Sequence, residues 1–239
     1  MTDSIQKTIK SGYRSIIVVF TKKSVKNLSI RVKTDKKVYV SLPRYASFAE
    51  AEAFIKDRAA FIDRALKRIE QAEKACPPIS YISGDRVNVF GNLKTLVVVR
   101  GAKNDCFLSG DSVYLSVKED DERTKKRVFD KFIKSLVESV VGDLCRRYYP
   151  FFSRKVKDFP TIKYKSMRSR WGSCTPTKNL LTFNYALIFA PVQCVEYVVV
   201  HEFSHFIEFD HSERFYRTVA AVMPDYKVRR DKLKSVMVL

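Results

Sequence analysis

Three histidines and one glutamate near the C-terminus have the types and spacing of a metal site. His201, Glu202 and His205 form an HExxH motif, and His211 follows six residues after His205. On a helix, residues four apart lie on one face, so both imidazoles of the motif can reach one ion at about 2.0–2.1 Å. A catalytic zinc site takes three protein ligands and keeps one position open. The spacing therefore predicts His201, His205 and His211 as the ligands of one Zn²⁺ per chain.

Glu202 has the chemistry of a general base beside that ion. Zinc lowers the pKa of a bound water to about 7, so a neighbouring carboxylate can accept its proton and pass it to a leaving amine. The motif predicts a hydrolase, more narrowly a zinc metallopeptidase, with Glu202 as its catalytic residue. Donors available for the developing oxyanion are Tyr216, Tyr226 and Arg229, and the sequence does not select among them.

The distribution of histidine supports a metal site. The chain contains three histidines, and all of them lie between residues 201 and 211. Histidines that only pack in a core or decorate a surface are not expected to gather at ligand spacing. A structural zinc normally takes a fourth Cys or His, and no adjacent motif offers one. Three imidazoles also suit iron, cobalt, nickel or manganese, so the residue types do not select zinc uniquely.

A helix is expected to carry the motif. Residues 192 to 209 are largely apolar and lack glycine and proline, and Pro191 stands where a first helical turn tolerates proline. The chain must then turn back to bring His211 to the metal. In metzincins a glycine makes this turn, but Glu208 occupies its position here. We expect Asp210 to adopt the left-handed conformation instead.

The first 118 residues are predicted to form a β-rich lobe. Its expected strands cover residues 28–32, 38–42, 87–90, 96–99 and 113–117. The first two are expected to form a hairpin across a polar turn. A capping box at Ser47 and Glu50 predicts one helix over about residues 47–75.

Residues 119–239 are predicted to form a second lobe that carries the motif. Beyond Asp120, apolar residues recur every three or four positions, which predicts a long helix. Short strands are expected near residues 161–164 and 180–187, and they form a small mixed sheet. The predicted fold class is α+β.

The charge of the chain indicates a second kind of partner. A formal net charge of +19 and a pI near 9.7 suit a polyanion such as nucleic acid. Aromatic residues alternate with basic ones over residues 146 to 170, as in surfaces that bind single strands. The alternative functions are a nucleic-acid-binding module with a structural metal, or a protease recruited to nucleic acid. The residues proposed for this surface are Arg146, Arg147, Arg154, Lys155 and Lys157.

Cysteine usage and the N-terminus favour a cytoplasmic protein without a membrane partner. The five cysteines are widely spaced and form no CxxC pair, which argues against a disulfide framework. The apolar run at residues 16–20 is too short for a signal sequence or a membrane span. The oligomeric state stays open.

Several segments resemble the YgjP-like metallopeptidases, zincins that are similar in broad design to the SprT-like and WLM proteases. The resemblance implies a zincin-like catalytic lobe behind a β-lobe, with the ligands and base named above and a peptide or protein as substrate. Trp171, Gly172 and Ser173 are hypothesised to lie on an edge strand that binds an extended peptide. The segments are SIRVKTDKKVYVSLPRYAS (29–47), RSRWGSC (168–174), LLTFNYALIFAP (180–191), VVVHEFSHFIEFDHSERFY (198–216) and MPDYKVRR (223–230).

Overall fold

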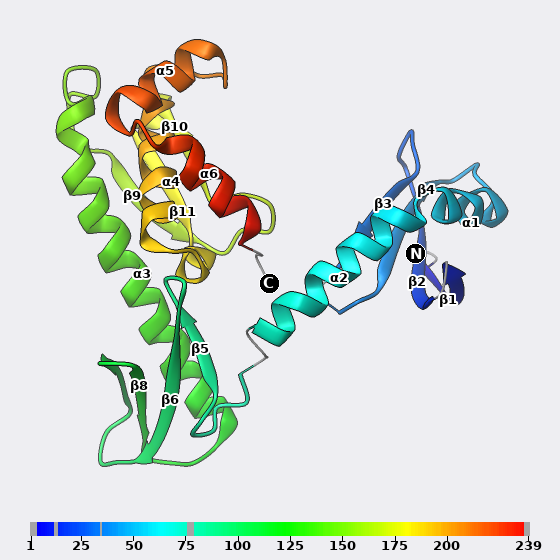
Figure 1. Cartoon of the computed structure of the whole chain (residues 1–239), viewed down its shortest axis with the longest axis horizontal. Coiled ribbons are helices and arrows are strands. Elements are labelled where there is room, and N and C mark those ends of the chain that lie inside the picture. The colour runs from blue at the N-terminus through cyan, green and yellow to red at the C-terminus, as the bar shows by residue number, and fades with distance from the viewer. Residues whose placement is uncertain (1–3, 12–13, 34, 76–78, 237–239) are drawn as a thin grey trace. The chain divides into compact units, whose positions relative to one another are not determined.

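The computed structural model describes residues 4–11, 14–33, 35–75 and 79–236, and it has the predicted α+β fold (Figure 1). The chain divides into two compact units, Met1–Pro77 and Pro78–Leu239. Each unit has a buried apolar cluster of its own. Within the described residues, no helix is both long enough and apolar enough to cross a membrane.

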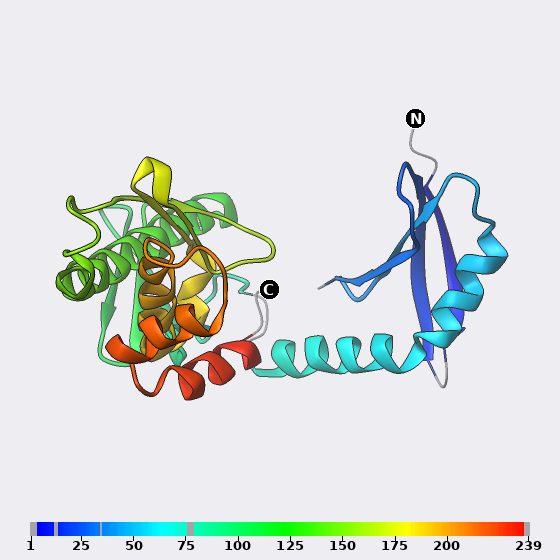
Figure 2. The ribbon, with the colours of Figure 1, turned by 90° about the horizontal axis from the view of Figure 1, so that it is seen from above.

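The N-terminal unit is a four-stranded sheet with two helices. Its elements are β1 (Ser4–Ser11), β2 (Arg14–Lys23), β3 (Ser29–Val32), β4 (Val38–Pro43), α1 (Phe48–Asp57) and α2 (Ala59–Ala75). The strand order is β1-β2-β4-β3, with β2 and β4 parallel and the other neighbours antiparallel. Figure 2 shows the strands of this unit and the two helices that follow them. Alternate residues of the central strands, such as Phe20 and Val40, are buried with Ile55 of α1 and Ile62 of α2. Period-two patterning therefore sets the buried face of this sheet.

The start of α1 is the predicted capping box. Ser47 Oγ accepts the N–H of Glu50 at 3.2 Å, and the Glu50 carboxylate accepts the N–H of Ser47 at 2.7 Å. The helix predicted over residues 47–75 is two helices, because the backbone at Arg58 leaves helical geometry (φ −98°, ψ 13°). The predicted hairpin is confirmed as β3 and β4. Strands β1 and β2 were not predicted, although the apolar run 16–20 lies within β2.

The C-terminal unit contains two small sheets and four helices among its described residues. Its elements are β5 (Arg86–Val89), β6 (Asn92–Arg100), β7 (Asp105–Ser109), β8 (Ser112–Val117), α3 (Glu122–Phe152), β9 (Thr161–Lys165), β10 (Gly172–Thr175), β11 (Leu180–Asn184), α4 (Val192–Ser204), α5 (Glu213–Val222) and α6 (Tyr226–Ser235), with 3-10 turns at Pro176–Lys178 and Tyr185–Phe189. One sheet has the order β5-β6-β8-β7. The other has the order β10-β11-β9, with β9 parallel and β10 antiparallel to β11. The long helix α3 runs past both sheets (Figure 1).

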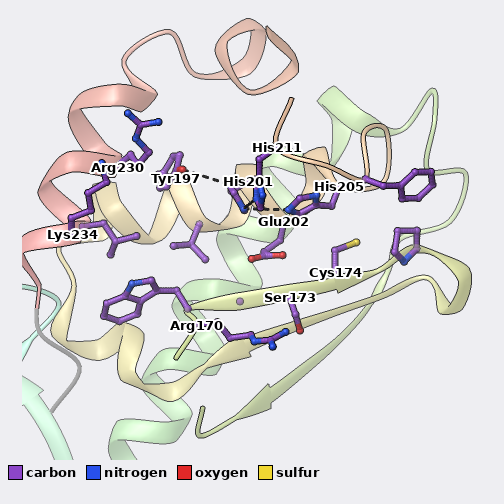
Figure 3. Close-up of a pocket in the computed structure, with 16 residues that line it drawn as sticks. Arg170, Ser173, Cys174, Tyr197, His201, Glu202, His205, His211, Arg230 and Lys234 are labelled. Carbon is purple, nitrogen blue, oxygen red and sulfur yellow. Dashed lines mark hydrogen bonds between the residues drawn. The ribbon is translucent and has the colours of Figure 1, made fainter. Parts of the chain in front are cut away.

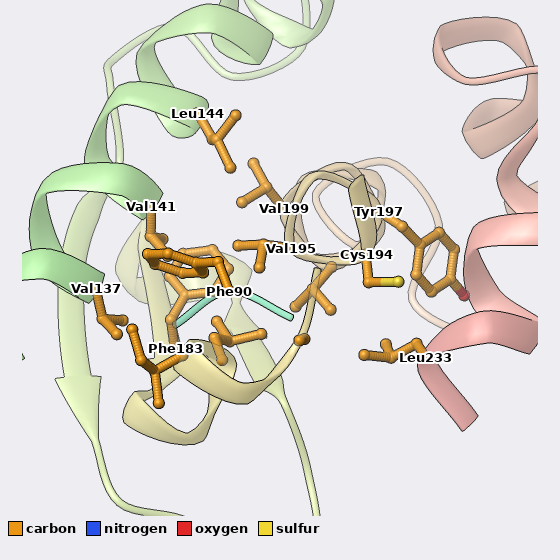
Figure 4. Close-up of a cluster of buried hydrophobic side chains, with 14 of the residues drawn as sticks. Phe90, Val137, Val141, Leu144, Phe183, Cys194, Val195, Tyr197, Val199 and Leu233 are labelled. Carbon is orange, nitrogen blue, oxygen red and sulfur yellow. The ribbon is translucent and has the colours of Figure 1, made fainter. Parts of the chain in front are cut away.

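The division between the units differs from the predicted boundary after residue 118. The sheet β5-β6-β8-β7 belongs to the C-terminal unit, because its buried residues share one core with α3 and α4. Figure 4 shows Phe90, which follows β5, among Val137 of α3, Phe183 of β11 and Val195 of α4. The N–H of Phe90 also donates to the carbonyl of Ile188 at 2.6 Å. A cut after residue 118 would divide this core.

Candidate metal centre

Helix α4 presents the HExxH motif at its C-terminal end. Most of the preceding residues, including Val195, Val198 and Val199, are buried, so the core holds the helix along its length. His201 and His205 lie one turn apart, with ring centroids separated by 4.9 Å (Figure 3). The spacing of four residues thus places both imidazoles on one face of the helix.

A tight turn after α4 brings His211 to the same place. The helix ends at Ser204, short of its predicted end at Phe209, and the N–H of Glu208 donates to the Ser204 carbonyl at 3.0 Å. The predicted left-handed conformation of Asp210 is wrong, because Asp210 is not among the described residues with positive φ. Its carboxylate accepts the N–H of Ser212 at 3.0 Å instead. This side-chain bond, and not a left-handed backbone, shapes the turn.

Phe215 of α5 packs against all three imidazoles. Its ring centroid lies 4.9 Å from that of His201, 4.5 Å from that of His205 and 4.9 Å from that of His211. The side chain is fully buried. This packing restricts the orientation of the rings before any ion binds. The role of Phe215 was not predicted. The sequence indicates it only by its position four residues after His211 in an amphipathic segment.

The ring nitrogens converge at the distances that a single ion requires. Nε2 of His201 lies 3.3 Å from Nε2 of His205 and 3.1 Å from Nε2 of His211. All three ligand atoms lie within 4.8 Å of one another. Tetrahedral coordination with Zn–N bonds of about 2.0–2.1 Å separates two ligand nitrogens by about 3.3 Å. The two distances from His201 agree with this separation, and the third nitrogen pair lies within 4.8 Å, so the three side chains could hold one ion.

The surroundings of the imidazoles favour the neutral form that a metal binds. Burial, with repulsion from His205 and His211, lowers the pKa of His201 to about 3, and burial also lowers the pKa of His205. Nδ1 of His205 lies 3.1 Å from the carbonyl oxygen of Glu208, and Nδ1 of His201 lies 3.4 Å from the hydroxyl of Tyr197. A proton on each Nδ1, donated to these oxygens, leaves the Nε2 lone pairs free for a metal.

Glu202 lies beside the imidazoles and is only 6% exposed. Burial raises its pKa to about 8, and Arg170 opposes this shift. Gly172 of β10 makes room for the carboxyl group, because a Cβ at this position would lie 2.7 Å from Oε1 and 2.9 Å from Cδ of Glu202. Such distances are shorter than van der Waals contact. Strand β10 and helix α4 approach each other so closely here that a side chain at position 172 would overlap with the carboxyl group of Glu202.

These groups line a cleft of about 660 Å³. One wall is β10, which contributes Gly172, Ser173 and Cys174, and the other contains residues of α4 and α6. The HExxH residues and His211 face this space together (Figure 3). A substrate that enters the cleft can therefore reach both the imidazole cluster and Glu202.

Comparison with known proteins assigns the chain to a family. Residues 26–236 match the family described as YgjP-like, metallopeptidase domain. The chain belongs to the YgjP-like metallopeptidases. It is therefore a metal-dependent hydrolase of peptide bonds whose substrate is a peptide or protein, and the predicted resemblance is confirmed.

The chain was also compared with solved structures and with curated proteins. Three chains of solved structures match. One is the crystal structure of the metallopeptidase zymogen of Pyrococcus abyssi abylysin, which is 18% identical over 39% of this chain and 90% of that chain, with a TM-score of 0.35. No curated protein matches.

The residues predicted to bind substrate lie at the start of β10 in this YgjP-like metallopeptidase. Trp171, Gly172 and Ser173 all line the cleft. Strand β10 is at the edge of its sheet, so among the described strands only β11 pairs with it. A role for the three residues in substrate binding stays a prediction. Next to them, burial raises the pKa of the Cys174 thiol to about 12, so it is protonated at neutral pH.

The three donors considered for the oxyanion do not line the cleft as the structure describes it. Tyr216 and Tyr226 stack on each other with centroids 5.6 Å apart, and Arg229 pairs with Glu196 and Asp225. Three polar residues that line the cleft were not predicted. For Tyr197 the sequence did offer a signal, because it lies four residues before His201 and therefore on the same face of the helix. The three residues are Tyr197, Arg230 and Lys234.

The basic residues proposed to bind nucleic acid lie at the end of α3 and in the segment that follows. Arg146 pairs with Asp143 at 2.7 Å, and Arg147 pairs with Glu196 at 3.2 Å. All five basic residues are exposed, and none of them is among the described residues that line the cleft. A nucleic-acid interface here stays a prediction. The remaining residues of the proposed surface are Arg154, Lys155 and Lys157.

Proposed function

We propose that this metallopeptidase uses zinc, held by His201, His205 and His211, and that Glu202 is its general base. The observation that carries the proposal is the convergence of three Nε2 atoms within 4.8 Å of one another beside a buried carboxyl group. All four side chains line one cleft. The arrangement suits the hydrolysis of a peptide bond in a substrate bound there.

Each residue has a defined part in the reaction. A zinc ion bound at this site would lower the pKa of a bound water and would polarise the scissile carbonyl. The three imidazoles would hold the ion through Nε2, and the Nδ1 contacts of His201 with Tyr197 and of His205 with Glu208 orient those two rings. A carboxylate oxygen of Glu202 accepts a proton from the attacking water and then donates it to the nitrogen of the leaving amine. Gly172 leaves Glu202 the space it needs for this role.

The donor set supports a catalytic ion over a structural one. Among the described residues, the candidate ligand group consists of the three histidines without a fourth His, Cys, Asp or Glu. A structural zinc site is normally closed by a fourth protein ligand, whereas a catalytic site keeps a position for water or substrate. The position of the histidines in a cleft agrees with the second arrangement.

The substrate backbone is proposed to pair with the free edge of β10. An extended peptide can add to an exposed sheet edge through main-chain hydrogen bonds, and pockets then select its side chains. Gly172 and Ser173 supply main-chain groups at this edge, and Trp171 supplies apolar surface. This placement brings the scissile bond close to Glu202.

The proposal is tested with the Glu202→Gln variant. Loss of a general base lowers turnover by about 10²–10⁴-fold, while the three imidazoles still hold about one zinc per chain. Cleavage of a peptide library and elemental analysis measure the two quantities. Glu196→Gln is the matched control, because Glu196 lies on α4 outside the cleft and pairs with Arg147 and Arg229. Cleavage by Glu202→Gln at the wild-type rate would contradict the proposed mechanism.

A further inference from the structure

The cleft is positively charged at one end. Arg230 and Lys234 of α6 line it on the side of Tyr197 away from His205 (Figure 3). They are four residues apart on the helix, so both side chains leave the same face. Cys174 lies toward the opposite end in the same view. Near Cys174 the cleft is lined by Pro176, which follows β10 and carries no charge.

The two cations share a single acidic neighbour. Lys234 pairs with Asp231 at 2.8 Å, and Nε of Arg230 lies 3.5 Å from the same carboxylate oxygen. Asp231 itself is 61% exposed along its side chain. Among the described residues, these two cations therefore have one carboxylate between them at this end of the cleft. Arg170, which also lines the cleft, adds a further positive charge.

Arg230 is held in place by aromatic rings. Its guanidinium lies over Tyr216, 5.7 Å from the ring centroid, and over Tyr226, 5.9 Å from the ring centroid. The two rings stack on each other. Stacking fixes the plane of the guanidinium, which then loses less conformational freedom when it binds an anion. A guanidinium positioned in this way suits the recognition of a carboxylate.

The direction of β10 decides which part of a substrate reaches these cations. The strand runs from Gly172 to Thr175, away from the Arg170 end of the cleft (Figure 3). A peptide that pairs with it in the antiparallel sense runs toward that end. In this antiparallel arrangement, which we take for the bound substrate, residues on the C-terminal side of the scissile bond come close to Arg230 and Lys234. Residues on the N-terminal side come close to Cys174 and Pro176.

We infer that Arg230 and Lys234 select substrates that carry a carboxylate on the C-terminal side of the scissile bond. The inference rests on the proposed function, because it takes Glu202 as the point of cleavage. The carboxylate has two possible sources, an Asp or Glu side chain or the C-terminus of the substrate itself. Both place the same planar anion in the charged end of the cleft.

The test uses quenched fluorescent peptides that differ only after the cleaved bond. One pair has Glu or Gln within the first three positions after the bond, and a second pair has a free or an amidated C-terminus. The zinc-loaded chain is expected to favour the anionic member of at least one pair by about three- to tenfold in kcat/KM, as for one ion pair at a partly exposed site. The pair that responds identifies the source of the carboxylate. Equal rates within both pairs, or a preference for Glu only before the bond, would overturn the inference.

Charge reversal at Lys234 tests whether this residue of the cleft determines which peptides are cleaved. Lys234 is 65% exposed along its side chain, so Lys234→Glu is expected to fold normally and to shift preference from Glu toward Lys in the same peptide position. Lys232→Glu is the matched control, because Lys232 is an exposed lysine of α6 outside the lining of the cleft. An equal shift in both variants would mean that overall charge, and not the cleft, determines selection, and would overturn the inference.

Binding to an inactive variant keeps the two proposals distinguishable. Zinc-loaded Glu202→Gln is titrated with labelled anionic and neutral peptides, and fluorescence anisotropy measures the Kd of each. The anionic peptide is expected to bind about three- to tenfold more tightly, with a smaller difference at high salt. Preferential binding without any cleavage by the wild type would contradict the proposed function alone. Cleavage without preferential binding would contradict the inference alone.

Discussion

The two units of the chain bury different kinds of residues. The cluster of the N-terminal unit is apolar throughout, with residues such as Val18, Phe20 and Leu42. The C-terminal unit buries a larger apolar cluster together with Asn184, Glu202 and Ser204, which are the buried polar residues among those described. Burial of polar groups costs free energy unless hydrogen bonds or function compensate.

The difference shows how the C-terminal unit builds its site. The side chain of Asn184 makes hydrogen bonds that hold the segment leading into β10, whereas the carboxyl group of Glu202 is buried beside the imidazole cluster with a raised pKa. One buried polar residue thus stabilises the wall of the cleft, and the other is the proposed general base. The N-terminal unit has no such pair among its described residues. Changes in the two units should therefore have separable effects on activity and stability.

Asn184 is where we expect the largest loss of stability. Its Nδ2 donates to the carbonyls of Met167 and Arg170, both at 2.8 Å, and its Oδ1 accepts the N–H groups of Met167 and Ala186 at 3.2 and 3.1 Å. Asn184→Ala removes these four bonds and leaves part-buried main-chain groups without this partner, so it should lower the free energy of unfolding by about 3 kcal/mol. Urea unfolding of the zinc-free chain measures this change.

Asn92→Ala is the matched control for Asn184→Ala. Asn92 is an exposed residue at the start of β6 and makes one long side-chain hydrogen bond, of 3.4 Å, to the carbonyl of Phe90. Its replacement should change the free energy of unfolding by no more than about 0.5 kcal/mol. If Asn184→Ala and Asn92→Ala were equally stable, the hydrogen bonds of the buried Asn184 side chain would not contribute specially to the stability of the C-terminal unit.

Gly172→Ala should reduce activity more than stability. The added Cβ would meet Cγ and Oε1 of Glu202 at 2.8 and 2.7 Å, so the buried glutamate side chain would have to shift from its place. Displacement of a catalytic group by about 1 Å lowers kcat by about ten- to a hundredfold. Zinc content should be unchanged, because the change does not touch the imidazoles. Steady-state kinetics and elemental analysis measure both effects.

Gly142→Ala provides the corresponding control. Gly142 is a buried glycine of α3, and a Cβ there would have its nearest contact at 3.6 Å, with Tyr164. Alanine in a helix is favoured over glycine by about 0.5–1 kcal/mol, so this variant should be as active and at least as stable as the wild type. Equal losses of activity in both variants would contradict the special role of Gly172.

Much of the candidate metal centre could be predicted from the sequence, because its residues lie close together along the chain. The spacing of four residues between His201 and His205 fixes their common face once a helix forms. The position of His211 required the chain to turn back, and the detail of that turn was wrong because Asp210 uses its side chain. Arg230 and Lys234 could not be predicted, since their position in the cleft depends on how α6 packs beside α4.

The boundary between units was also beyond sequence patterning. Period-two alternation identifies strands such as β8, but it does not say against which helix their buried face packs. Phe90 and Val113 lie in the core that α3 and α4 share, and only tertiary structure reveals this. The capping box at Ser47, in contrast, was predictable because all of its bonds lie within four consecutive residues.

Ser47→Ala is expected to have the smallest effect and to remain within the N-terminal unit. Loss of the N-cap should reduce stability at α1 by about 1 kcal/mol, with zinc content and peptide hydrolysis unchanged. Hydrogen bonds from Ser47 lower the pKa of Glu50, so this carboxylate stabilises the helix above its unfolded pKa of about 4.3 and loses the effect as the pH falls through its folded pKa. The difference between wild type and variant should therefore shrink in acid. Hydrogen exchange of α1 amides at several pH values measures it, and a parallel fall in hydrolysis would mean that the units are not separable.

Metal content tests the central claim most directly. After dialysis against a weak chelator and readdition of one equivalent of zinc, elemental analysis should find about one ion per chain in the wild type and in Glu202→Gln. His211→Ala, which keeps the HExxH motif but removes the third imidazole, should retain far less than one. Equal zinc content in His211→Ala and wild type, or a wild type that holds no divalent ion, would contradict the three-histidine centre.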